Sequence, residues 1–387
     1  MPVYEYLKRG KTHYYYAFEV KDRKGKRKTI KERGFTGKTA ARDAERLARV
    51  EWDKGTYIDP TKLTVGTFMT QWLKDKQDIS PETRLTNQSH LKVHIIPQIG
   101  HIMLQKFTVQ DIKDFIKYMQ KEDTELAEGT IKKIYNLIQT AFTSAKIEDL
   151  IGTDPFDKMD KGSIPKVNKV NHDYWTKDEV KNFFERLAPI ENRFHAMYVL
   201  AIYTGMRRGE ILGLRWKDID FENGLISIRQ TLKPKRRIKD GGKNLSSSRS
   251  IKISAVVSAE LKKHRGFMIK ERWGATERYR TNEELEFAQN NYKELDLIFC
   301  QTNGEPIGLG NFNRMWRLIV KKTEMRYIKF HDLRHTCASL LLSNGTHPKV
   351  VQELLGHSSI AITMDTYSHM LPNMQEEAVN SLDKLLN

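Results

Sequence analysis

Cysteine is nearly absent from the 387-residue sequence, which contains only Cys300 and Cys337. Two cysteines exclude a disulfide framework and a four-cysteine zinc site, and their scarcity suits a reducing cytosol. The sequence also lacks an apolar run near the roughly 18–20 residues that a membrane span requires. Its first residues, MPVYEYLKRGK, lack the apolar core of a secretory signal. These absences predict a soluble cytoplasmic protein with no membrane partner.

Positive charge is in clear excess, because 66 Lys and Arg residues face 49 Asp and Glu residues. The net charge of +17 divides into +7 for residues 1–60, +2 for residues 61–171 and +8 for residues 172–387. The N-terminal segment therefore has the densest positive charge. Such a balance favours a polyanionic partner, of which nucleic acid is the simplest.

Residues 1–60 have the pattern of a small α+β unit, a three-stranded sheet with one helix. Strand-forming residues run from His13 to Val20, and residues 27–35 can return as the next strand. Residues 38–54 then change to helical spacing. One helix covers only one face of such a sheet, so the other face is free to present Lys and Arg between aromatic side chains. Most of the aromatic side chains are expected to form a small core.

Residues 61–151 are predicted to form an all-α domain of four helices. Ser80, followed by Pro81 and Glu82, is a strong start signal, because it combines a capping hydroxyl, proline at the first position and acid in the first turn. The other three helices are expected to begin near Thr64, Thr108 and Thr130.

Residues 152–172 are rich in Pro, Gly and Lys and are predicted to be a linker. Residues 173–387 are predicted to form a mixed, mainly α domain with a small β-sheet. Thr176 and Glu179 form a capping-box signature there, and a helix is expected to run to about Thr204. The remaining expectations are a short helix at 208–214, strands at 225–231, 250–254 and 297–300, a helix at 255–272, an irregular surface excursion at 273–295 and further helices to the end.

Four short segments of the last domain carry residue types suited to chemistry. They are TGMRRGE at 204–210, HDLRH at 331–335, LGH at 355–357 and DTY at 365–367. Each alone is a weak signal, because Gly can simply end a helix and a Tyr is usually part of a core. His331 and Arg334 are three residues apart, so on a helix they share a face.

Together and in this order, the segments resemble the signature of the tyrosine recombinases, the integrases of phages and mobile elements. The resemblance assigns the catalytic set to Arg207, His331, Arg334, His357 and Tyr367, and it places a catalytic lysine on a β-hairpin. The segment KNLSSSRSI at 243–251 resembles that hairpin, which assigns the lysine to Lys243, with Lys233, Lys235 and Lys239 nearby.

The chemistry of phosphodiester cleavage is consistent with these residue types. Arg207 and Arg334 would neutralise the phosphate, because guanidinium groups stay charged and bind phosphate through two donors. His331 and His357 would donate hydrogen bonds, with His331 also a candidate base for the nucleophile Tyr367. Lys243 would protonate the leaving 5′-oxygen. No metal or cofactor is expected, and Glu210 and His335 are expected to be structural.

The resemblance also implies an arrangement of domains and partners. Residues 1–60 would be an arm-type DNA-binding domain, residues 61–151 a core-binding domain and residues 173–387 the catalytic domain. The implied partners are double-stranded DNA at core and arm sites, three further copies of the chain in a tetramer, an excisionase and a host DNA-bending protein. An apolar stripe in Asn373–Leu386 predicts a final helix that packs on its own domain or on a neighbouring protomer.

Two other functions are compatible with the same residues. A type IB topoisomerase-like enzyme would nick and rejoin DNA with the same side chains. A DNA-binding regulator without catalysis would keep the fold alone, although all six chemical positions are occupied here.

Overall fold

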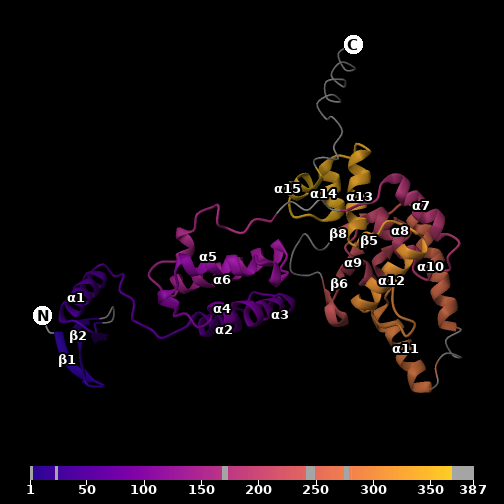
Figure 1. The fold of residues 1–387 in the computed structure, drawn as a ribbon. Coiled ribbons are helices and arrows are strands. Elements are labelled where there is room, and N and C mark those ends of the chain that lie inside the picture. The colour runs from indigo at the N-terminus through magenta and orange to yellow at the C-terminus, as the bar shows by residue number, and fades with distance from the viewer. Residues whose placement is uncertain are drawn as a thin grey trace, which may run out of the picture. The chain divides into compact units, whose positions relative to one another are not determined.

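The chain forms two compact units, Met1–Lys169 and Val170–Asn387. The computed structural model describes residues 3–21, 25–167, 173–240, 249–273, 279 and 281–367 (Figure 1). Within these ranges, no helix is both long enough and apolar enough to cross a membrane.

The first unit begins with the predicted three-stranded antiparallel sheet and its single helix. The elements are β1 (Val3–Lys8), β2 (Lys11–Lys21), β3 (Arg27–Phe35) and α1 (Lys38–Asp53), with β2 in the centre of the sheet. Side chains alternate along β2, so Tyr16 and Phe18 are buried in a small core with residues of α1. The prediction that the aromatic residues form a core is therefore correct for these two.

The opposite face of this sheet carries aromatic and basic side chains. The rings of Tyr15 and Tyr4 stack with their centroids 5.0 Å apart. Lys31 Nζ lies 4.5 Å from the Tyr15 ring centroid and the Arg33 guanidinium lies 5.3 Å from it. Cation–π contacts of this kind hold positive charge on an exposed face.

The second part of this unit contains the predicted helices. Their bounds are α2 (Val65–Asp75), α3 (Pro81–His90), α5 (Val109–Met119) and α6 (Glu128–Ile147), with a π-helical turn (Leu91–Ile95), α4 (Ile96–Ile99) and short 3₁₀ turns at Leu104–Lys106 and Glu122–Thr124 between them. The side chains of Thr64, Ser80 and Thr108 each accept a backbone N–H of the first helical turn, which confirms these three starts. The fourth helix, α6, begins at Glu128, two residues before the expected Thr130, and it has no side-chain cap.

The core of this part extends into the segment that was predicted to be a linker. Residues Pro155–Lys158 form a 3₁₀ turn, and the Phe156 ring lies edge-on to Tyr135 with centroids 5.4 Å apart. Phe156 and Met159 are both buried in the core of the helical part. The first part of residues 152–172 therefore packs, while the domain boundaries themselves stay a prediction.

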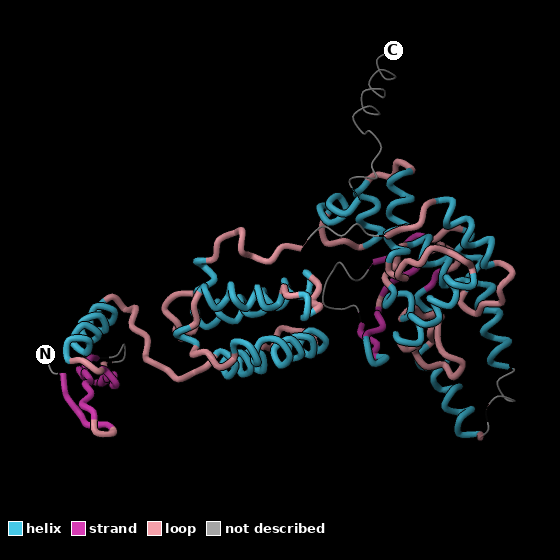
Figure 2. Tube along the Cα trace, in the orientation of Figure 1, coloured by secondary structure: helices cyan, strands magenta, loops and turns pink. Residues whose placement is uncertain are grey.

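The second unit is mainly helical, with two small antiparallel sheets (Figure 2). Its strands are β4 (Ile219–Asp220), β5 (Leu225–Ile228) and β8 (Arg249–Lys252) in one sheet and β6 (Gln230–Lys233) and β7 (Arg237–Asp240) in the other. Its helices are α7 (Lys177–Leu187), α8 (His195–Thr204), α9 (Arg208–Leu212), α10 (Ala255–Trp273), α11 (Asn282–Leu295), α12 (Leu309–Lys322), α13 (Asp332–Ser343), α14 (Pro348–Leu355) and α15 (Ile360–Tyr367).

Three expectations about the secondary structure of this unit were wrong. The capping box of Thr176 and Glu179 is present, but the helix ends at Leu187 and a new one begins at His195. Pro189 lies in the break, where it cannot donate a backbone hydrogen bond. The segment Leu297–Cys300 is buried but makes only isolated bridges at its ends, so it is not a regular strand.

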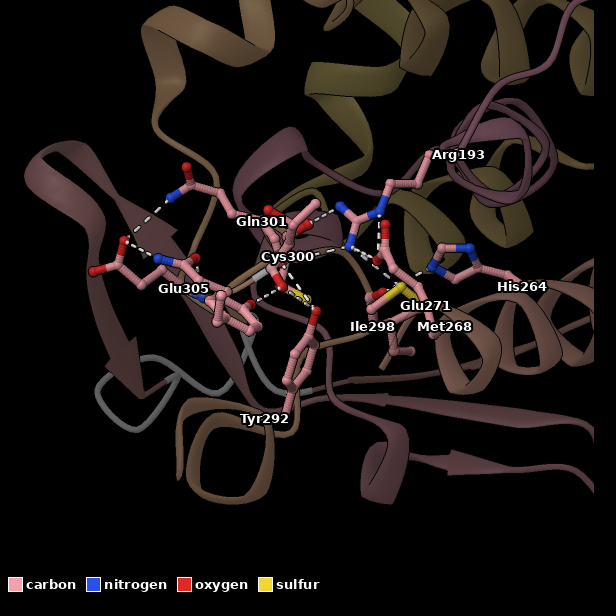
Figure 3. A network of polar contacts seen from close by, with 12 residues as sticks. Arg193, His264, Met268, Glu271, Tyr292, Ile298, Cys300, Gln301 and Glu305 are labelled. Atoms are coloured by element: carbon pink, nitrogen blue, oxygen red, sulfur yellow. Dashed lines mark hydrogen bonds and ion pairs between the residues drawn. The ribbon is translucent and has the colours of Figure 1, made fainter. Parts of the chain in front are cut away.

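Helix α11 occupies most of the segment that was predicted to be irregular. The side chain of Thr281 caps its start. Its buried face consists only of Ala288 and Tyr292, so the many charged residues around them leave no apolar period in the sequence. The Tyr292 hydroxyl donates to the Thr302 carbonyl at 2.8 Å (Figure 3). In the same network, Arg193 Nε donates to Glu271 of α10 at 3.0 Å.

Two glycines let strand β6 approach helix α9 closely. A Cβ atom on Gly209 would lie 2.7 Å from the Leu232 carbonyl oxygen, and one on Gly213 would lie 3.1 Å from the Leu232 nitrogen. Gln230 Nε2 donates to the Gly213 carbonyl at 2.7 Å. Helix and strand are thus in backbone contact, which only glycine permits.

Replacing Phe142 by Ala is expected to destabilise the helical part of the first unit by about 3–5 kcal/mol. Phe142 is fully buried, and its ring centroid lies 4.7 Å from that of Phe107, so truncation leaves a cavity. Hydrogen–deuterium exchange of the full chain should show the loss of protection in residues 65–159. Leu85→Ala, at a residue that is 54% exposed, is the matched control. An equal effect of the two variants would contradict the assignment of this core.

Candidate active site

Five of the six predicted site residues are described, and they lie together in the second unit. Arg207 precedes α9, His331 and Arg334 lie at the start of α13, His357 lies between α14 and α15, and Tyr367 ends α15. Figure 1 shows α13, α14 and α15 side by side. Arg207, Arg334 and His331 all interact electrostatically with the His357 imidazole, and Arg334 also does so with the Tyr367 phenol.

The predicted lysine, Lys243, lies outside the described residues, as does Asn373–Leu386. Among the nearby lysines, Lys233 is on β6, Lys239 is on β7 and Lys235 is in the turn between these strands. The identity of the catalytic lysine therefore stays a prediction.

A left-handed turn at Gly205 lies between two of the arginines: it binds Arg334 and it precedes Arg207 in the chain. Gly205 has φ of +59°, where glycine is favoured, and a Cβ atom on it would lie 2.5 Å from Leu355 Cδ2. Its carbonyl accepts a hydrogen bond from Arg334 Nη1 at 2.9 Å. The turn ends α8, and two residues later Arg207 precedes α9. The TGMR segment therefore positions Arg207 through the shape of its backbone.

The buried carboxylate of Glu210 orients Arg207. It accepts the backbone N–H of Arg207 at 2.9 Å and Nη1 of the same residue at 2.8 Å. Arg207 Nη2 donates to the Gly356 carbonyl at 2.9 Å. The guanidinium therefore spans from Glu210 to the turn that precedes His357, and the Arg207 side chain is 40% exposed. Glu210 thus positions a predicted catalytic residue, which is consistent with the structural role expected for it.

Arg334 has one guanidinium nitrogen that lacks a hydrogen-bond partner among the residues that the structure describes. This nitrogen, Nη2, is buried, whereas Nη1 is held by Gly205. Burial and the charge of Arg207 lower the pKa of Arg334 to about 10, which leaves the group charged at neutral pH. A buried, charged donor without an acceptor is energetically unfavourable, so binding of an anion there is favoured.

His357 is held as a neutral imidazole. Gly356, with φ of +67°, turns the chain out of α14, and Gln352 Nε2 donates to the His357 carbonyl at 2.9 Å. His357 Nδ1 lies 2.9 Å from Thr363 Oγ1. Burial, followed by the charge of Arg334 and of its neighbours, lowers the pKa of His357 to about 4. The ring is therefore available as a neutral hydrogen-bonding group.

Tyr367 is buried in the described structure, with an exposed fraction of 3%. It packs in a small apolar cluster formed by side chains of α13 and α14, including Leu355. Its hydroxyl oxygen lies 2.5 Å from His335 Nδ1. Burial raises the pKa of Tyr367, although the charge of Arg334 acts in the opposite direction. The phenol is therefore protonated in this arrangement.

His335 contacts the predicted nucleophile, which the sequence reasoning did not foresee. The available signal was its spacing, since His335 is one helical turn after His331 and shares its face. The two imidazole rings are perpendicular, with centroids 5.8 Å apart. His335 therefore belongs to the site.

Arg249 also belongs to the surroundings of the site and was not singled out from the sequence. Its guanidinium donates to both carboxylate oxygens of Glu210, at 3.1 and 2.9 Å. Nothing in the local sequence signals this contact, because Glu210 is 39 residues away along the chain.

The assembled side chains suit an anionic ligand. Three guanidinium groups and one buried carboxylate lie around the turns at Gly205 and Gly356. No three His, Cys, Asp or Glu side chains in the described ranges come together in a way that could hold a metal ion. A phosphate could accept hydrogen bonds from Arg207 and Arg334 together.

Three protein-family models match successive parts of the chain. The phage integrase family matches residues 173–374, the N-terminal SAM-like domain of phage integrases matches residues 64–120, and the arm DNA-binding domain matches residues 2–51. A protein named tyrosine recombinase XerC-like from Caldanaerobacter subterraneus subsp. tengcongensis is 28% identical, over 98% of each chain.

Solved structures share the fold. The Tn1549 transposon integrase, in complex with a circular intermediate DNA, matches with a TM-score of 0.68 and 21% identity, over 84% of this chain and 99% of that one. The lambda integrase tetramer bound to a Holliday junction matches with a TM-score of 0.55 and 19% identity, over 94% of each chain. Since the phage integrase model covers more than half of the sequence, the chain belongs to the phage integrase family and is a tyrosine recombinase.

Proposed function

We propose that this tyrosine recombinase is the integrase of a bacterial mobile element, which it inserts and also excises by site-specific DNA recombination. The observation that carries the proposal is the group of Arg207, Arg334, His357 and Tyr367, in which a buried guanidinium nitrogen of Arg334 lacks a partner in the described part of the chain. A scissile phosphate would supply the missing acceptor.

In the proposed reaction, the Tyr367 oxygen attacks phosphorus and the bond to the 5′-oxygen breaks. Arg207 and Arg334 neutralise the negative charge that develops on the non-bridging oxygens, and His357 donates a further hydrogen bond. The phenolic proton leaves to a histidine, for which His335 is a candidate beside the predicted His331, because its Nδ1 is within hydrogen-bonding distance of the hydroxyl. The leaving oxygen takes a proton from Lys243.

The 3′-phosphotyrosine link conserves the energy of the broken bond. The 5′-hydroxyl of a second DNA strand can attack this link, which rejoins DNA and releases Tyr367 without ATP. Strand exchange between two duplexes requires four such cleavages, which supports a homo-tetramer on DNA. The lambda integrase tetramer is a precedent for the assembly in a chain of the same fold.

The N-terminal sheet is proposed to bind arm sites in double-stranded DNA. Its free face presents Lys31 and Arg33 on the ring of Tyr15, and neither basic residue is buried. The match of residues 2–51 to an arm DNA-binding domain supports this assignment. Residues 61–151 would bind the core site together with the catalytic domain, residues 173–387.

Arm sites distant from the crossover point imply bent DNA. We therefore expect a host DNA-bending protein and an excisionase as partners, and a cytoplasmic location at the chromosome. A type IB topoisomerase-like activity is the second candidate, because it would use the same side chains. The arm-binding domain favours recombination, since a nicking enzyme needs no second DNA site.

Tyr367→Phe is expected to abolish covalent attachment to DNA, because it removes the attacking oxygen. Wild type should form a covalent adduct with a nicked suicide duplex that carries the end junction of the element, in EDTA as well as without it. The variant should still bind this duplex, and Tyr203→Phe, at an exposed tyrosine of α8, is the matched control. Adduct formation by Tyr367→Phe, or inhibition of wild type by EDTA, would refute the assignment.

Lys31→Ala combined with Arg33→Ala is expected to weaken binding to arm-site DNA. The salt dependence of binding should also become shallower, by roughly one unit of slope for each phosphate that the protein no longer neutralises. Cleavage of an isolated core site should not change. Lys38→Ala combined with Arg42→Ala, at exposed residues of α1, is the control, and equal losses in both double variants would argue against a role of the sheet face.

Acid is expected to destabilise the catalytic domain partly through His357. Its pKa is lowered to about 4 in the folded chain, so between pH 6.5 and 4 the unfolded chain binds the additional proton and stability falls as pH falls. A pKa shift of this size changes the free energy of unfolding by at most about 3 kcal/mol. Solvent around the half-buried ring reduces this change to about 1 kcal/mol.

His357→Gln stays neutral at every pH and should lose less stability than wild type between pH 7 and 4. Urea denaturation of the full chain at several pH values, read by hydrogen–deuterium exchange in residues 173–367, measures this difference. Parallel curves for the two proteins would contradict the neutral state of His357.

A further inference from the structure

Arg249 is a largely buried arginine at the start of strand β8, with a side chain that is 11% exposed. All three of its guanidinium nitrogens donate hydrogen bonds within the protein. Nη1 and Nη2 donate to the two oxygens of Glu210, at 3.1 and 2.9 Å, and Nε donates to the Leu354 carbonyl at 3.1 Å. A guanidinium that is occupied in this way is positioned by the protein.

The Arg249 guanidinium also fills the space beside the turn that carries His357. A Cβ atom on Gly356 would lie 2.9 Å from Arg249 Nη1 and 3.0 Å from its Cζ. Gly356 is in the left-handed region, with φ of +67°. Glycine at position 356 therefore lets the turn and Arg249 lie in direct contact.

Arg207 and Arg249 both donate hydrogen bonds to α9 and to the end of α14. Arg207 donates to Glu210 and to the Gly356 carbonyl, while Arg249 donates to Glu210 and to the Leu354 carbonyl. These contacts form a closed ring that connects α9, β8 and the end of α14. The carboxylate is 7% exposed, and the two arginines lower its pKa although its burial alone would raise it.

We infer that Arg249 is a positioning residue for phosphodiester cleavage, which holds Glu210 and the Leu354–Gly356 turn so that Arg207 and His357 face the scissile phosphate. This inference rests on the proposed function. Arg249 acts through Arg207 and the turn, because its own nitrogens are engaged inside the protein. Without it, the buried Glu210 carboxylate retains Arg207 as its guanidinium partner and draws Arg207 away from the Gly356 carbonyl.

The second unit contains a matched control for this arginine. Arg193 and Glu271 form another largely buried pair, with side chains 16% and 9% exposed. Figure 3 shows their network, whose partners include carbonyls of the Cys300 segment and Met268 but none of the predicted site residues. Loss of Arg193 therefore tests what a buried ion pair contributes to stability alone.

The test uses the full-length chain and a nicked suicide duplex that carries the end junction of the element. Arg249→Gln should lower the single-turnover rate of covalent cleavage at saturating DNA by about 100-fold, while the Kd for the duplex changes less than about threefold. Arg249→Lys keeps the charge but loses the paired guanidinium donors, so its cleavage rate should lie between those of Arg249→Gln and wild type. Arg193→Gln should lower the melting temperature but leave the rate within about threefold of wild type.

A double-mutant cycle separates positioning from a general loss of stability. If Arg249 acts through Arg207, adding Arg249→Gln to Arg207→Gln should cost less than about a further fivefold in rate. Independent, multiplying losses would overturn the inference.

The outcomes also separate the inference from the function on which it rests. If wild type cleaves and Arg249→Gln cleaves equally well, or no worse than Arg193→Gln, the inference fails and the proposed function stands. If wild type forms no covalent adduct, both fail. Should Arg249→Gln not fold, Arg249→Lys provides the same comparison of rate and affinity.

Discussion

The candidate site in the second unit requires several positively charged side chains to lie close together. Arg207 and Arg249 both act electrostatically on Arg334, and this repulsion would oppose folding if nothing offset it. Glu210 offsets it with one carboxylate, and the carbonyl oxygens of Gly205, Leu354 and Gly356 accept the donors that remain close to it. Of the nitrogens of these three arginines, Arg334 Nη2 is buried without a partner in the described part of the chain, which suits the binding of an anion.

The positive charge of the chain has two physical forms. In the N-terminal sheet, Lys31 and Arg33 lie exposed on aromatic rings, where salt ions reach them and long-range attraction dominates. Around Arg334, which is buried, the low dielectric strengthens both the repulsion from the neighbouring arginines and the attraction for a phosphate. The first form suits finding DNA, and the second suits chemistry on one of its phosphates.

Features set by neighbouring residues could be predicted from the sequence, whereas contacts across the fold could not. The caps at Thr64, Ser80, Thr108 and Thr176 depend on a hydroxyl and the next three residues, so they were found correctly. The family motifs indicated the group around Arg207 and Tyr367, although its catalytic roles stay a proposal.

The failures have identifiable causes. Helix α11 was missed because only Ala288 and Tyr292 face inward, which leaves no clear apolar period. Arg249 was missed because its partner is distant along the chain, and a basic residue in a serine-rich segment gives no sign of burial. His335 was assigned a structural role because its contact with Tyr367 depends on how α15 packs against α13.

The contact between α9 and β6 has a consequence for which changes near the hairpin disturb Arg207. At Gly209 and Gly213 the strand backbone lies where a methyl group would be, so the base of the β6–β7 hairpin is bound to the helix that Arg207 begins. The tip at residues 234–236 is exposed, and Arg236 in it forms an ion pair with Glu305 at 2.8 Å. We therefore expect a change in the length of the exposed tip to disturb Arg207 less than a side chain added at Gly209 or Gly213.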